Sequence, residues 1–240
     1  MSSLLNFKKL AGFSAIYLAI ANLIGIIIFL FILDYPNIVD PYQKITILLN
    51  NQMLIYLTNM LLYVIWGILF AVLVLYLYYR LKDSNAVSDA TVPNTSNISS
   101  NSNTSSMPSP ILPIATVIGI IWAILLISSG LIANAGIAPV VAMFQQDPSQ
   151  ATLFWSLIET VSDGLGGVYN GELFGGLVTL LISIVGLRRG SLPKGLNYCG
   201  LVIGAIGLIS VIPGLHDIGG IFGIGQILWF IWLGITLIKE

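Results

Sequence analysis

The sequence predicts an all-α integral membrane protein: a bundle of six transmembrane helices with one amphipathic helix on its outer surface. Hydrophobic residues make up 57% of the chain and charged residues only 8%, and the mean hydropathy is +0.96. These values lie outside the range of soluble domains. The apolar residues form runs of about 20, the length that a helix needs to cross a hydrocarbon core roughly 30 Å thick. The runs are apolar on every side, which favours helices over the alternating strands of a barrel.

Each apolar run is interpreted as one span, and the runs cover residues 10–33, 53–79, 111–133, 168–187, 198–212 and 221–238. The fifth run is the shortest, and we expect it to extend to Leu196 at one end and to Leu215 at the other. The first run contains Ala19-Ile20-Ala21, which has the small residues of a signal-peptidase site, but it continues well beyond this triplet. We therefore expect a permanent span there instead of a cleaved signal peptide.

The basic residues predict the orientation of the spans. Lysine and arginine next to a span resist translocation, so they mark its cytoplasmic end. Eight of the nine basic residues fall on one side of a six-span chain: Lys8, Lys9, Arg80, Lys82, Arg188, Arg189, Lys194 and Lys239. Lys44 lies on the other side, together with most of the carboxylates. Both termini are therefore predicted to be cytoplasmic.

A polar segment between the second and third spans divides the chain. Residues 83–110 are dominated by serine, asparagine and threonine, and such a segment buries too little apolar surface to fold. We expect a two-span unit at residues 1–82, a disordered cytoplasmic linker at 83–110, and a four-span unit at 111–240.

The loop between the third and fourth spans is predicted to contain a helix at residues 148–165. Asp147 and Pro148 have the residue types of an N-cap and a first turn, and Gln150 completes a capping box. Hydrophobic residues then recur at helical spacing: Phe154, Ile158, Val161 and Leu165. Because the polar face carries carboxylates and no base, it lacks the pattern that binds anionic lipid. We expect this helix to pack across the outer mouth of the bundle, with Trp155 near the headgroups.

Glycines spaced four residues apart indicate close helix contacts in the last three spans. This spacing lets two helix backbones approach where the hydrophobic effect does not drive association. The pairs are Gly171 and Gly175, Gly200 and Gly204, and Gly219 and Gly223. We interpret them as packing within the chain in preference to a dimer face. The strongest neutral polar residues of the spans are expected to form hydrogen bonds between helices, with a polar pathway as the alternative: Asn22, Asn59, Asn134 and Gln226.

Five ionisable residues on the outer side are candidates for a ligand or ion site: Glu159, Asp163, Glu172, His216 and Asp217. Glu172 is the only ionisable residue inside a predicted span, where a charge costs at least about 2.5 kcal/mol, and this makes it a functional hypothesis. The alternative interpretation, which we favour, is structural: Glu172 lies in the first turn of a helix, where the helix dipole stabilises its carboxylate and headgroup water is close.

The sequence predicts no catalytic residue, no metal site and no cofactor. His216 beside Asp217 has the composition of an oriented general base, but no nucleophile stands at a recognisable spacing, so a solvated turn residue is favoured. One histidine and one cysteine, Cys199, are too few for the usual zinc sites and for two-histidine haem ligation. We interpret Cys199 as a packing residue. A calcium or magnesium site made of carboxylates alone stays an alternative, although no loop pattern in the sequence supports it.

Two segments of the chain carry a resemblance to a known family. The first is Phe7-Lys8-Lys9-Leu10-Ala11-Gly12, and the second runs from Glu172-Leu173-Phe174-Gly175-Gly176 to Leu187-Arg188-Arg189-Gly190-Ser191-Leu192-Pro193-Lys194-Gly195-Leu196. Both resemble a prokaryotic family of six-span proteins filed as domain of unknown function 4386, although the long Asn/Ser-rich linker departs from that family's compact pattern. The resemblance implies the cytoplasmic membrane of a bacterium or archaeon, and it brings no established activity.

Three classes of function remain, in the order in which we favour them: a non-enzymatic accessory or binding protein; a small-solute transporter, channel or sensor with an acidic outer vestibule; and an intramembrane enzyme. The lipid bilayer is an expected partner, a small molecule or a partner membrane protein is a further candidate, and no nucleic acid is expected. Transport and enzyme functions would both fail if Glu172 lay far from His216 and Asp163 and no cavity reached it.

Overall fold

The computed structural model describes residues 2–90 and 110–239, and all regular elements in these ranges are helical. The prediction of an all-α chain is confirmed over this part of the sequence. In order, the elements are α1 (Ser2–Ile26), η1 (Ile27–Ile32), η2 (Tyr35–Asn37), α2 (Pro41–Asn50), α3 (Gln52–Asn59), η3 (Met60–Ile65), α4 (Trp66–Ala90), α5 (Ile111–Phe144), α6 (Pro148–Gly166), α7 (Val168–Arg189), α8 (Lys194–Ser210), η4 (His216–Ile218) and α9 (Gly219–Lys239).

Five helical stretches in the described residues are long and apolar enough to cross a membrane: Asn6–Ile32, Gln52–Lys82, Ile111–Phe144, Pro148–Arg189 and His216–Lys239. α8 corresponds to the fifth predicted span and is also apolar, but it has only 17 residues. At 1.5 Å per residue it is about 26 Å long, which is less than a hydrocarbon core of about 30 Å. The helix ends at Ser210, so the expected extension to residue 215 is not helical.

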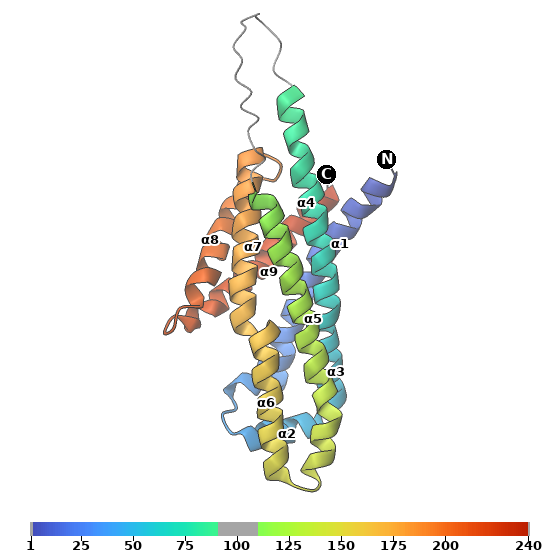
Figure 1. Ribbon diagram of the computed structural model, residues 1–240, viewed down its shortest axis with the longest axis vertical. Helices are drawn as coiled ribbons and strands as arrows, with labels where there is room; N and C mark the ends of the chain where they lie inside the picture. The colour runs from blue at the N-terminus through green and yellow to red at the C-terminus, as the bar shows by residue number, and fades with distance from the viewer. Residues whose placement is uncertain (1, 91–109, 240) are drawn as a thin grey trace, which may run out of the picture.

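The two chain ends lie at the same end of the molecule (Figure 1). The far end of α4 and the turn between α7 and α8 are also there, whereas α2, α6 and the last part of α5 lie at the opposite end. Helices from the two predicted units interleave, since α1 packs against α4 and α9, and α4 packs against α5. α4 continues to Ala90, into the segment predicted to be a disordered linker, and residues 91–109 of that segment lie outside the described residues.

A glycine turn joins α7 to α8 at the basic end of the molecule. Gly190 has a φ of 61°, the left-handed conformation that glycine adopts without steric cost and that commonly ends a helix. The guanidinium of Arg80 donates a hydrogen bond to the carbonyl of Ser191 at 2.8 Å, and Arg189 donates to the carbonyl of Leu81. Basic side chains therefore tie α4 to this turn.

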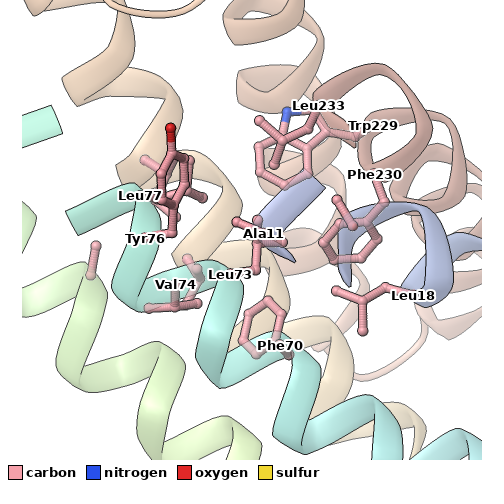
Figure 2. Close-up of a cluster of buried hydrophobic side chains, with 14 of the residues drawn as sticks. Ala11, Leu18, Phe70, Leu73, Val74, Tyr76, Leu77, Trp229, Phe230 and Leu233 are labelled. Carbon is pink, nitrogen blue, oxygen red and sulfur yellow. The ribbon is translucent and has the colours of Figure 1, made fainter. Parts of the chain in front are cut away.

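Buried hydrophobic side chains form two cores. The bundle core takes residues from α1, α4, α5, α7, α8 and α9. Figure 2 shows its centre, where α1, α4 and α9 meet: Ala11, Leu18, Phe70, Leu73, Val74, Tyr76, Leu77, Trp229, Phe230 and Leu233. The second core, called the outer core below, lies at the end that holds α2 and α6: Leu33, Ile45, Leu48, Ile55, Ile137, Val140, Ala151, Trp155 and Ile158.

α6 begins as the sequence predicts but lies elsewhere. The Asp147 carboxylate accepts a hydrogen bond from the backbone N–H of Gln150 at 3.0 Å, and Pro148 is in the first turn. The helix runs alongside the last part of α5 (Figure 1), instead of crossing the mouth of the bundle. The residues that it buries are Ala151, Trp155, Ile158, Ser162 and Gly166.

The buried face of α6 is therefore rotated from the predicted one. Phe154 and Val161 were expected to face the protein, and both are exposed. Trp155 is 5% exposed, so it does not reach the headgroups as expected. Its indole N–H donates to the Tyr35 hydroxyl at 2.9 Å. This bond gives the indole a buried partner, which explains why the tryptophan, and not Phe154, takes the inner position.

Candidate functional site

A cavity of about 330 Å³, open on one side to the surface of the protein, lies between α1, η3, α4, α5, α7 and α9. This volume is at the small end of the range in which proteins bind small molecules. Five aromatic side chains contribute to its wall: Tyr63, Trp66, Trp122, Phe222 and Phe230. Its polar side chains are Asn22, Glu172 and Gln226. The cavity is thus an apolar, aromatic space with a few polar groups, the usual composition of a ligand site.

The aromatic wall is held by ring contacts and by one hydrogen bond. The ring centroids of Trp66 and Trp122 are 5.1 Å apart in an edge arrangement, and those of Trp66 and Phe230 are 5.9 Å apart. The indole N–H of Trp66 donates to the carbonyl of Leu18 at 3.3 Å. These contacts fix Trp66 at the junction of α1, α4, α5 and α9, so the wall of the cavity is preformed.

Glu172 is buried in the first part of α7, with 4% of its surface exposed. The Ser210 hydroxyl, at the end of α8, donates to its Oε2 at 2.7 Å and also lies 2.8 Å from the carbonyl of Gly207. A hydroxyl has one hydrogen, so it donates to one of these oxygens at a time. It donates to Glu172 when the carboxylate is ionised; a neutral carboxyl can instead donate to Ser210, which then donates to Gly207. Both protonation states are hydrogen-bonded.

The other oxygen of Glu172 lies against the beginning of α9. A Cβ atom placed on Gly219 would lie only 1.8 Å from Oε1 of Glu172. The carboxylate thus occupies the position that the side chain of any residue other than glycine would need. The first N–H groups of a helix carry partial positive charge, which favours an anion at this point. The Glu172 carboxylate therefore joins the start of α7, the end of α8 and the start of α9.

Gln226 places a second buried acceptor at the cavity. Its amide Nε2 donates to the Thr179 hydroxyl at 2.7 Å and to the carbonyl of Gly175 at 3.4 Å. Its Oε1 is buried and has no hydrogen-bond partner among the described residues. A buried oxygen without a donor costs free energy, and a ligand that donates a hydrogen bond would remove that cost.

Two π-helical segments lie next to the cavity. η1 follows Ile26 directly, and η3 contributes Leu62 and Tyr63 to the wall. Such segments interrupt the regular backbone hydrogen bonds of a helix and are frequent at functional sites. The Tyr17 hydroxyl donates to the carbonyl of Leu61 at 3.1 Å, so α1 supplies a side-chain donor to this irregular backbone.

Of the five ionisable residues predicted as a site, Glu172 alone lines the cavity. Glu159 belongs to a separate group in the outer part, where its Oε1 accepts from the Tyr35 hydroxyl at 2.5 Å and lies 3.8 Å from Nζ of Lys44. Asp163, on the same helix, is exposed. His216 and Asp217 are exposed in η4, directly before Gly219. The acidic outer residues therefore divide between two places.

The Glu159 group is held by opposing electrostatic effects. Burial raises the pKa of Glu159 above its ordinary value, while the hydrogen bond from Tyr35 and the charge of Lys44 lower it and Asp163 raises it. Burial and the neighbouring Glu159 carboxylate raise the pKa of Tyr35, which stays a hydrogen-bond donor at neutral pH. Nζ of Lys44 lies 5.2 Å from the centre of the Tyr35 ring. These contacts fasten α6 to the segment before α2.

The six glycines predicted to pack helices have two kinds of surroundings. Four of them leave no room for a Cβ atom: Gly175, Gly200, Gly204 and Gly219. At Gly204 such an atom would lie 2.7 Å from the carbonyl of Gly176, so α7 and α8 touch through their backbones. Gly171 and Gly223 have nothing within 4 Å of that position, and both border the cavity. They add open volume beside Glu172.

The sequence reasoning missed the neighbours of Glu172 and the aromatic wall. Ser210, Thr179, Trp66 and Trp122 were not among the predicted site residues. Ser210 lies 38 positions from Glu172, so no local spacing could indicate the contact. Asn22 and Gln226 were noted as polar residues within spans, and both line the cavity together with Glu172.

These features define the class of the protein. Several apolar helices of membrane-spanning length surround a cavity with buried polar groups, and the part of the chain that the structure describes is all-helical, with the apolar helices of a membrane protein. Comparisons with protein-family models, with curated proteins and with solved structures found no match.

Proposed function

We propose that this protein is a non-enzymatic binding protein of the membrane, and that its site is the cavity beside Glu172. One observation carries the proposal: a buried carboxylate borders a cavity of about 330 Å³ and forms no ion pair with any described residue. A charge inside a span is costly, so it is kept where it serves a purpose. A bound ligand that neutralises the carboxylate supplies such a purpose.

The proposed arrangement in the bilayer has six spans, with α8 as a short fifth one and both termini in the cytoplasm. Support comes from the basic residues, which the sequence concentrates at the chain ends and at the α7–α8 turn, and from Figure 1, where these parts lie at one end. In this arrangement α2, α6 and the outer core project on the other side. The resemblance to the six-span prokaryotic family agrees with this topology and with a cytoplasmic membrane.

A transporter or sensor is the second candidate. The π-helical segments η1 and η3 favour it, because irregular turns beside a cavity are places where a helix can change its register. An intramembrane enzyme has the least support, since serine, cysteine, lysine and histidine are missing from the described residues that line the cavity.

Cyclohexylmethanol, a small neutral probe, tests whether the cavity binds ligands. The full-length protein in phosphatidylcholine nanodiscs is titrated with the alcohol by calorimetry, and we expect saturable binding. Gly223→Leu fills the cavity and abolishes this binding, whereas Gly220→Leu is the matched control: both glycines are in α9 with nothing within 4 Å of a Cβ atom, and Gly220 is not in the cavity wall. Equal heats for wild type and Gly223→Leu would show partitioning into lipid and would overturn the proposal.

A further inference from the structure

We infer that the ligand of this cavity is a small organic cation, a protonated amine with an apolar body. The inference rests on the proposed function, because it names the ligand class of the same site. It combines three observations: the polar groups that face the cavity, the nature of its walls, and the absence of a competing basic side chain among the described residues.

Two of the buried polar side chains that line the cavity offer hydrogen-bond acceptors, and the indole N–H of Trp122 is a buried donor without a partner among the described residues. Glu172 and Gln226 are each 4% exposed, and both line the cavity. Glu172 offers a carboxylate that accepts from the Ser210 hydroxyl, and Gln226 offers an Oε1 without a partner among the described residues. An ammonium group carries three N–H donors and one positive charge, so it can donate to an acceptor of this kind and neutralise the carboxylate. A carboxylate or phosphate ligand would be repelled.

The walls suit the same kind of ligand. Trp66, Trp122, Phe222 and Phe230 present aromatic rings, and the face of such a ring attracts a cation within about 6 Å of its centre. The same rings provide apolar surface for the body of the ligand. Gly171 and Gly223 leave space next to the carboxylate, so a substituted amine can approach it.

Among the described residues, no basic side chain is shown in an ion pair with Glu172. The ion pair formed in the described residues joins Lys44 to Glu159, in the outer part. The other basic residues lie at the ends of the apolar segments in the sequence. The buried carboxylate has open space beside it, and a bound cation would supply a positive charge that the ion pair of the described residues does not bring to it.

The test compares two probes of the same shape, cyclohexylmethylamine hydrochloride and cyclohexylmethanol. Calorimetric titration of the full-length protein in phosphatidylcholine nanodiscs should give a dissociation constant about tenfold lower for the amine, the gain expected from a charged hydrogen bond over a neutral one. Glu172→Gln should remove this preference while alcohol binding persists. Glu159→Gln, which removes a carboxylate outside the cavity, should keep it.

The outcomes separate the two proposals. If the alcohol binds in the cavity and the amine binds no more tightly, the inference of a cation is overturned and the binding function stands. If neither probe binds, both are overturned. If Glu172→Gln retains the preference for the amine, the cation does not sit at Glu172 and the inference fails. Should that variant not fold, Gln226→Leu provides the second measurement: amine affinity should fall more than alcohol affinity, and equal losses would contradict the inference.

Discussion

Replacing Gly219 with alanine would test the geometry of Glu172 directly. A Cβ atom at this position would lie 1.8 Å from Oε1 of Glu172, so the variant can fold only if the carboxylate moves. The movement would break the 2.7 Å hydrogen bond from Ser210, and a hydrogen bond to a charged group contributes about 1.5–3 kcal/mol. We expect Gly219→Ala to lower the free energy of unfolding by about 2 kcal/mol.

The matched control is Gly220→Ala, at the next position of α9, where a Cβ atom would have nothing within 4 Å. Both substitutions share the gain in helix propensity, at most about 1 kcal/mol, so their difference isolates the contact with Glu172. Unfolding of the full chain in mixed detergent micelles, followed by circular dichroism, measures both. Adding Glu172→Ala should cancel the penalty of Gly219→Ala. The geometry is refuted if the two single variants agree within about 0.5 kcal/mol, the precision of such comparisons.

Two further predictions concern the outer half of the molecule. Asn59 donates to Asn134 Oδ1 at 3.0 Å in a buried pair, so Asn59→Leu should cost about 0.6–1.7 kcal/mol in the same unfolding measurement, and an unchanged stability would show that the pair contributes nothing. The pKa of Glu159 in the folded protein is raised from 4.5. Protonation of this carboxylate therefore stabilises the folded state relative to the unfolded state. Its stabilising contribution is therefore complete below pH 4.5 and is lost as the pH rises through the higher pKa of the folded state. As the pH increases through this range, the free energy of unfolding of the wild type should fall relative to that of Glu159→Gln. An increase relative to Glu159→Gln would contradict the burial of Glu159.

The positions of the long helices could be predicted from the sequence because the signal is local. A run of about 20 apolar residues has one stable form in a bilayer, a helix. The start of α6 was also predictable, since Asp147 and Gln150 are neighbours in the chain and cap the same turn. The length of α8 was not, because the turn after Ser210 uses Gly214 with a φ of 89°, a conformation that hydropathy does not indicate.

The candidate site was predictable only in part, because its contacts join distant segments. Glu172 is identifiable as an ionisable residue in an apolar run, but its partners are Ser210 at the end of α8 and Gly219 at the start of α9. Glu159 and Asp163 were grouped with it because they share a side of the membrane. The structure assigns Glu159 to Tyr35 and Lys44 instead, since shared topology does not make two residues neighbours.

The length of α5 has a consequence for how this protein can be divided. Its 34 residues extend about 51 Å, roughly 20 Å more than the thickness of a hydrocarbon core. The same helix supplies Trp122 and Leu126 to the cavity wall and Ile137 and Val140 to the outer core. The part of α5 that belongs to the outer core is accordingly no detachable module. A deletion that removes it would cut through the helix that encloses the ligand site, and any force or partner acting on the projecting end acts on the wall of that site as well.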